Sequence, residues 1–250
     1  MKNILLISFG DTPRNNALIY HFENFGAKVY HYNFFNFEER KEYYKLKEPI
    51  SGLVLGGATP NRIPDNTTFK QNNLQSKRNL PHLMSENPSL YKEIMNLVEK
   101  YYNIPILGIC YGCQILNKFY GGSLPEQLEK KSIGKEETHL LHSRLFKNMP
   151  RKVWVDYNHR FLTLTGAPNS RIIAYTKGSE GSKIVGYEYN NIHYGVQFHI
   201  INSDPVAYRL LDNFYKICLE EPNVQNNNKL IYGLTGILLF IYMISNRLKK

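Results

Sequence analysis

The chain has 250 residues, of which 42% are hydrophobic, and this is enough for one large α/β domain plus an appendage. The formal net charge is +10, but four of the positive charges lie in the last 22 residues and the other basic residues are scattered, so the composition argues against a nucleic-acid partner. Three cysteines (Cys110, Cys113 and Cys218) are too few and too unevenly placed for a disulfide framework, which favours a reducing compartment.

Strand and helix patterns alternate along the first half of the chain. The first apolar run is followed by a turn at residues 10–13, which is typical of a buried strand and not of a signal peptide. Such alternation predicts a parallel sheet with right-handed crossovers. The predicted strands are residues 3–9, 27–32, 52–55 and 104–109, and the predicted helices are residues 15–25 and 89–101.

Beyond Gly121 and Gly122 the pattern becomes rich in strands. Asn190 and Asn191 are expected to form a hairpin turn, and a helix is expected over residues 204–219. We therefore predict an α/β fold of the flavodoxin-like kind, with an open, mostly parallel sheet flanked by helices and a strand-rich C-terminal part. The strands of that part are predicted at residues 153–157, 171–175, 183–188 and 193–198.

Residues 58–87 form a long polar stretch rich in Asn and Pro, directly after Gly56 and Gly57. A loop of that length in a compact domain is usually either functional or disordered. Because it leaves the carboxyl edge of the sheet, it is a candidate lid or partner-docking loop, and plain disorder is the alternative.

The most informative motif lies where the strand at residues 104–109 ends. Gly108 and Gly112 flank Cys110, so the chain can turn tightly from a strand into a helix. We expect the thiol at the apex of this turn, exposed and close to the helix N-terminus, where the thiolate is favoured. This is the cysteine version of the nucleophile elbow. The alternatives are a buried structural cysteine and a redox pair of Cys110 with Cys113.

A cysteine nucleophile needs a base and donors for the oxyanion. His199 is the best candidate base, because it ends a predicted strand and the carboxyl ends of parallel strands meet at one edge of the sheet. The expected oxyanion donors are the backbone N–H groups of Tyr111, which follows the nucleophile, and of Gly57 on an adjacent strand.

Together these motifs resemble the class I (triad-type) glutamine amidotransferase domain, closest to the glutaminase part of GMP synthases, over roughly residues 1–218. The matching pieces occur in the order found in that family. They are residues 52–57 for the oxyanion strand, 105–114 for the elbow, 121–122, 145–150 with 153–155, and 195–199.

The resemblance implies hydrolysis of glutamine. Cys110 would attack the side-chain amide, His199 would carry the proton to the leaving ammonia, and water would hydrolyse the γ-glutamyl thioester. It also places Gln114 and Asn158 among the residues that bind the substrate. Ammonia would pass to a synthetase on a separate polypeptide, since no P-loop is present. No cofactor and no metal are expected.

Two departures from the family pattern matter. The family reads His-Pro-Glu after Gln-Phe, whereas this chain has His199, Ile200 and Ile201, so the glutamate that orients the histidine is missing. A Cys–His dyad remains, in which Asp204 or Glu188 could take over the orienting role. Residues 156–159 also differ from the Ser-His-Gly-Asp-like segment of GMP synthases, and His159 is either a second polar contact or a surface residue.

Two other functions stay open. One is a catalytically inactive relative kept as a membrane scaffold, which the missing glutamate motivates. The other is a γ-glutamyl peptide hydrolase, which needs no ammonia acceptor.

The C-terminal residues differ in character from the rest. Residues 1–220 are predicted to form the amidotransferase-like domain and residues 221–229 a polar linker. Residues 230–246 are apolar and bracketed by basic residues, and about 16 of them would span about 24 Å as a helix. We expect a single-pass membrane anchor there, with the remaining domain in the cytoplasm. The alternative is a helix buried in the domain or in an oligomer interface.

Overall fold

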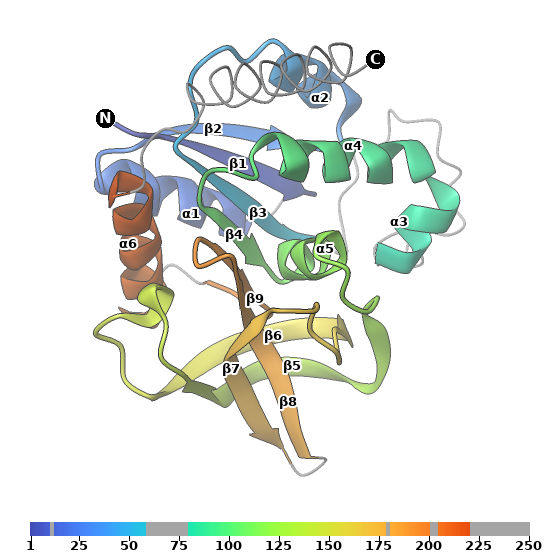
Figure 1. The fold of residues 1–250 in the computed structure, drawn as a ribbon, viewed down its shortest axis with the longest axis vertical. Helices are drawn as coiled ribbons and strands as arrows, with labels where there is room; N and C mark the ends of the chain where they lie inside the picture. Colours follow the sequence, from blue (N-terminus) through green and yellow to red (C-terminus); the bar gives the residue numbers. More distant parts are fainter. Residues whose placement is uncertain (11–12, 59–79, 179–180, 201–204, 221–250) are drawn as a thin grey trace, which may run out of the picture.

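The structure is a computed structural model, and it describes residues 1–10, 13–58, 80–178, 181–200 and 205–220. One nine-stranded sheet runs through the molecule in the order β2-β1-β3-β4-β9-β8-β7-β5-β6, and Figure 1 shows it curling from the blue strands β1 and β2, past the orange β8 and β9, to the yellow β6. The strands are β1 (Asn3–Phe9), β2 (Lys28–Asn33), β3 (Gly52–Ala58), β4 (Ile106–Ile109), β5 (Glu126–Leu140), β6 (Lys152–Leu162), β7 (Arg171–Gly178), β8 (Gly181–Tyr189) and β9 (His193–Val196).

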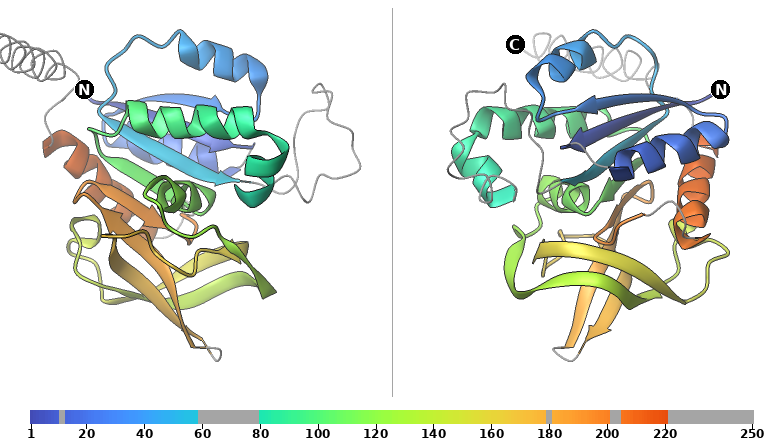
Figure 2. Two further views of the ribbon diagram at one scale, coloured as in Figure 1. Left: turned by 45° about the vertical axis from the view of Figure 1, so that its right-hand side comes forward. Right: turned by 180° about the vertical axis from the view of Figure 1, so that it is seen from behind.

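The first half of the sheet is parallel and covered on both faces. Side chains alternate across it, so that Ile4 and Leu6 pack with α1 and α6 while Leu5 and Ile7 pack with α4 and α5. Figure 2 shows the two helix layers from both sides. The helices are α1 (Pro13–Asn24), α2 (Phe37–Tyr44), α3 (Leu80–Glu86), α4 (Pro88–Lys100), α5 (Tyr111–Phe119) and α6 (Pro205–Glu220), with a 3₁₀ turn at η3 (Arg144–Phe146).

The second half of the sheet is antiparallel, which corrects the expectation of a mostly parallel sheet. The four pairings from β2 to β9 are parallel and the four from β9 to β6 are antiparallel. The predicted hairpin turn is confirmed: Asn190 and Asn191 both have positive φ, at 51° and 61°, and they reverse the chain between β8 and β9. The sheet is therefore mixed, with β9 joining its two halves.

The expected C-terminal transmembrane helix is the second correction to the predicted fold. No helix within the described residues is both long enough and apolar enough to cross a bilayer. Residues 221–229 and 230–246, on which the linker and the anchor were predicted, lie outside the described residues. The membrane anchor, the membrane partner and the single-pass localisation that rested on it are therefore withdrawn.

Candidate functional site

Cys110 stands at a strained turn between β4 and α5. Its backbone has φ 53° and ψ −102°, a conformation that L-residues rarely adopt. The flanking glycines are required by close contacts: a Cβ on Gly112 would lie 2.1 Å from the carbonyl oxygen of Leu55, and one on Gly108 would lie 2.5 Å from the carbonyl oxygen of Gly112. The elbow predicted from the glycine spacing is therefore present, with α5 pressed against β3.

A buried glutamine, Gln197, contacts the sulfur of Cys110, and a second, Gln114, holds Gln197. The Nε2 of Gln197 donates to Sγ at 3.4 Å, and the Nε2 of Gln114 donates to the Oε1 of Gln197 at 3.2 Å. Gln114 also donates to the carbonyl oxygen of Phe161 at 3.0 Å. The backbone N–H of Tyr111 hydrogen-bonds the sulfur as well. Cys110 thus has donors in place that stabilise negative charge on sulfur.

His199 and Gly57 lie next to this cysteine. A Cβ built on Gly57 would sit 3.5 Å from the Cε1 of His199 and 3.6 Å from the Cβ of Cys110. The backbone N–H of His199 donates to the carbonyl oxygen of Asp156 at 2.8 Å, which ties the end of β9 to β6. The backbone of Asn158 hydrogen-bonds the imidazole. The structure therefore brings together Cys110, His199 and Gly57, which are far apart in the sequence.

Burial controls the ionisation of the pair. It raises the pKa of the Cys110 thiol to about 11, against the opposing effects of the Arg14 charge, the Tyr111 N–H and Gln197. It lowers the pKa of His199 to about 3, and the Arg14 charge acts in the same direction. The resting pair is thus a neutral thiol and a neutral imidazole. This corrects the expectation of an exposed thiolate: Cys110 is only 7% exposed, and desolvation outweighs the helix N-terminus.

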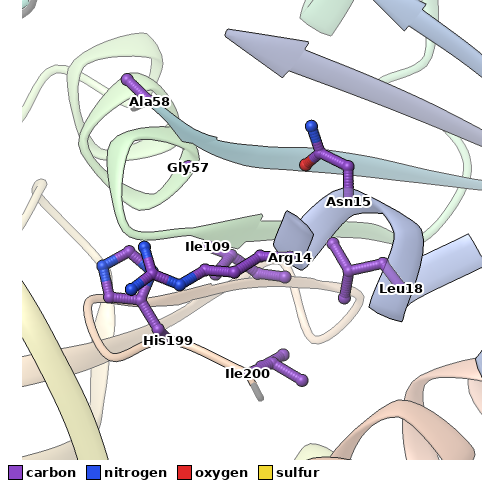
Figure 3. Close-up of a pocket in the computed structure, with 8 residues that line it drawn as sticks. All are labelled: Arg14, Asn15, Leu18, Gly57, Ala58, Ile109, His199 and Ile200. Atoms are coloured by element: carbon purple, nitrogen blue, oxygen red, sulfur yellow. The ribbon is translucent and has the colours of Figure 1, made fainter. Parts of the chain in front are cut away.

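A small pocket opens beside His199, and Arg14 lies in it. The pocket is formed by the first turns of α1, the end of β3, the end of β4 and the segment after β9. Figure 3 shows the guanidinium of Arg14 drawn across the His199 ring, with Gly57 above them. A cation beside the candidate base was not predicted from the sequence. The only signal for Arg14 is its place just after the first strand, at the carboxyl edge of the sheet.

Other predicted site residues have different surroundings. Glu188 accepts a hydrogen bond from Ser143 and forms an ion pair with Arg171, both at 2.7 Å, so it is engaged elsewhere and does not orient His199. Asp204 lies outside the described residues. His159 is buried, which excludes the surface alternative, and burial lowers its pKa to about 4.

Cys113 belongs to α5, a short distance along the helix from the elbow. It is a free, buried cysteine, as are Cys110 and Cys218. Its sulfur packs against β9, where a Cβ on Gly195 would lie 2.8 Å from it. In this structure Cys113 fills the space between α5 and β9.

The glutamine amidotransferase class-I family model matches residues 15–214. A GMP synthase (glutamine-hydrolysing) of Borreliella burgdorferi strain N40 is 34% identical over 189 residues, which is 72% of this chain and 31% of that protein. One subunit of a GMP synthase (glutamine-hydrolysing) from Pyrococcus abyssi is 35% identical over 133 residues, covering 50% of this chain and 66% of the relative.

The fold has solved counterparts. A crystal structure described as that of a GMP synthase subunit from Thermoplasma acidophilum superposes with a TM-score of 0.68 at 19% identity, over 90% of this chain and 98% of the other. This likeness concerns the fold. The chain spans about a third of the length of the first curated GMP synthases that it matches. The family match covers most of the sequence, including both Cys110 and His199, and the chain belongs to the class I glutamine amidotransferases.

Proposed function

We propose that this chain hydrolyses the side-chain amide of glutamine through a cysteinyl thioester. The observation that carries the proposal is the strained backbone of Cys110 together with the position of Gly57, which lies next to both Cys110 and His199. A strained nucleophile held beside a base and a close-packed backbone is the arrangement that acyl transfer requires.

The reaction follows from the ionisation of the pair. The neutral imidazole of His199 accepts the thiol proton as Sγ bonds to the amide carbon, and the carbonyl oxygen takes up the negative charge. The backbone N–H groups of Tyr111 and Gly57 are the proposed donors to that oxyanion. The C–N bond then breaks, and His199 returns its proton to the leaving ammonia. Water, deprotonated by His199, cleaves the thioester to release glutamate and the free thiol.

Gln197 is a positioning residue in this scheme. Its contact with Sγ is fixed by Gln114, so the two amides hold the sulfur and stabilise its charged form. Asn158 supports the imidazole through its backbone. Direct contact of Gln114 or Asn158 with the substrate stays a prediction.

The ammonia acceptor is proposed to be a synthetase on a separate polypeptide. Two observations support this: a relative is named as one subunit of a GMP synthase, and other GMP synthases extend far beyond the matched region. The partner test is co-purification of the full chain with GMP synthase subunits of the same source, followed by glutaminase assays of the mixture.

Labelling with 6-diazo-5-oxo-norleucine, an electrophilic glutamine analogue, tests the hydrolase. We expect one adduct per full-length chain, on Cys110, prevented by excess glutamine and absent in Cys110→Ala. Cys113→Ala is the matched control and should label normally. A Cys110 that reacts with iodoacetamide but not with the glutamine analogue would refute the proposal.

A catalytically silent binding protein is the second candidate, and a specific observation favours it. The Arg14 charge beside His199 opposes formation of the imidazolium that catalysis requires. On this alternative, glutamine would bind without ammonia release, which calorimetry combined with a coupled ammonia assay distinguishes. γ-Glutamyl peptides are the alternative substrates for the same site. Their rates of hydrolysis, measured beside that of glutamine, show which substrate the site prefers.

A further inference from the structure

Among the residues that the structure describes, the positive charge in the pocket beside His199 has no counter-charge. Arg14 carries a permanent positive charge, and no described carboxylate forms an ion pair with it. The first turn of α1, to which Arg14 and Asn15 belong, also has no acidic residue. The positive end of a helix dipole therefore adds to the guanidinium on this side of the pocket.

His199 lines the same pocket, and one nitrogen of its imidazole lacks a hydrogen-bond partner among the described residues. His199 is 5% exposed, and its Nε2 is buried without a hydrogen-bond partner among the described residues. A buried ring nitrogen without a partner is energetically unfavourable. The guanidinium of Arg14 and the ring of His199 line the same small pocket. Once the ring is protonated, both groups can donate a hydrogen bond to one acceptor in that pocket.

We propose that Arg14 and His199 form a carboxylate-binding site, and that a bound carboxylate stabilises the imidazolium of His199 during catalysis. The inference rests on the proposed hydrolase function for its catalytic half, while anion binding itself is independent of turnover. Arg14 is a positioning residue in this scheme, because it holds the carboxylate that acts on His199.

The surrounding charges are consistent with this assignment. The charged and titratable groups that act on His199 are Arg14 from α1 and His159 from β6, with Lys183 of β8 near His159. Cys110 of the elbow lies near His199, on the other side of Gly57. Arg14 and His159 both oppose a charge on the ring. An anion in the pocket offsets the first of these and provides the imidazolium with an acceptor.

The carboxylate has two sources, the substrate and the solution. Glutamine carries an α-carboxylate, so its binding at Arg14 would make the substrate complete the site. A small free carboxylate such as acetate would do the same from solution. The chemistry is shared, and kinetics distinguishes the sources.

Binding is measured first, on the full chain and without turnover. Thermal unfolding is followed at pH 6 with increasing acetate, with sodium chloride keeping the ionic strength constant. We expect a saturable rise of a few degrees in Tm, lost in Arg14→Gln and kept in Arg209→Gln, an exposed arginine of α6. The titration of the His199 ring, followed by NMR with labelled histidine, should shift to higher pH with acetate in the parent and not in Arg14→Gln.

Kinetics then assigns the source. If the substrate supplies the carboxylate, Arg14→Gln lowers kcat/KM for glutamine about 100-fold but leaves glutaminamide unaffected, and acetate inhibits. If the solution supplies it, acetate activates glutamine hydrolysis, and Arg14→Gln abolishes that activation. Equal effects of acetate and chloride on Tm, or acetate effects that persist in Arg14→Gln, would overturn the inference. A carboxylate-dependent shift in a chain without glutaminase activity would leave the site standing and refute only the proposed function.

Discussion

Individual residues of the site differ in how far the sequence reveals them. Cys110 and His199 follow from local patterns, since the glycines mark the turn and the strand end places the histidine. Arg14 and Gln197 do not, because their roles depend on contacts made only when α1, β4 and β9 pack together. Burial of the Cys110 thiol also cannot be predicted from a local pattern, because the residues that desolvate it come from several elements.

Gly57→Ala should reduce glutaminase activity while leaving the stability of the fold nearly unchanged. The added Cβ meets only ordinary contacts, at 3.5 Å from His199 and 3.6 Å from Cys110, so Tm should change little. It would nevertheless occupy the space between nucleophile and base, and we expect glutaminase kcat to fall about 100-fold. Gly56→Ala is the control, since its Cβ would point toward Asn15 at 3.4 Å. Equal activity of the two variants would contradict the assigned position of the reaction centre.

The alkylation rate of Cys110 should depend on pH in an unusual range. Burial raises the pKa of this thiol to about 11, so the thiolate fraction is low at pH 7 and increases with pH. In a Cys113→Ala, Cys218→Ala background, the rate with iodoacetamide should still be increasing at pH 9 to 10. A rate that reaches a plateau below pH 8 would show that the resting thiol is already ionised.

At the scale of elements, buried runs were easier to predict than exposed ones. Strands β1, β3 and β4 of the parallel half are buried, mostly apolar runs and were predicted near their observed bounds. β5 was missed because it is rich in Lys and Glu, and its pairing with β6 and β7 stabilises it more than burial does.

Short helices were also missed, because burial of an apolar face does little to define them. α2 depends on its cap, where the Oδ1 of Asn36 accepts from the N–H of Glu38 at 3.0 Å and its amide donates to Glu39 at 3.0 Å. α3 lies within the stretch predicted as an irregular loop over residues 58–87, of which residues 59–79 are outside the described residues.

The contact of α5 with β3 gives a prediction at this scale. Gly112→Ala would place a Cβ 2.1 Å from the backbone of Leu55, and backbone cannot yield as a side chain does. We expect the free energy of unfolding to fall by about 3 kcal/mol or more, measured by urea denaturation. Gly56→Ala again provides the comparison and should cost less than about 1 kcal/mol. A Gly112→Ala variant as stable as the parent would show that α5 can move away from the sheet.

For the whole molecule, buried neutral histidines predict sensitivity to acid. Burial lowers the pKa of His159 and His193 to about 4 and that of His199 to about 3. The unfolded chain binds these protons more readily than the folded chain does. The free energy of unfolding is therefore at its full value above about pH 6.5 and decreases as the pH falls toward 4. Each histidine accounts for about 2 to 3 kcal/mol of that loss.

Urea midpoints between pH 7 and pH 4 test this expectation. His193 is a useful reporter because its ring bridges the hydroxyl of Tyr120 and the carbonyl oxygen of Ile104, away from the candidate site. His193→Gln should lower stability at pH 7 and flatten its dependence on pH. A parent chain equally stable at pH 7 and pH 4.5 would refute the argument.

The neutral state of Cys110 also has a consequence for oxidative damage. Peroxide attacks thiolates far faster than thiols, and oxidation beyond sulfenic acid is irreversible for most cysteines. On the proposed mechanism, Cys110 is kept protonated by burial and is deprotonated by His199 only when a substrate is bound, so it would be a poor target for peroxide in the free protein. If the chain is the proposed hydrolase, the same burial that slows the resting thiol would protect it from oxidation between turnovers.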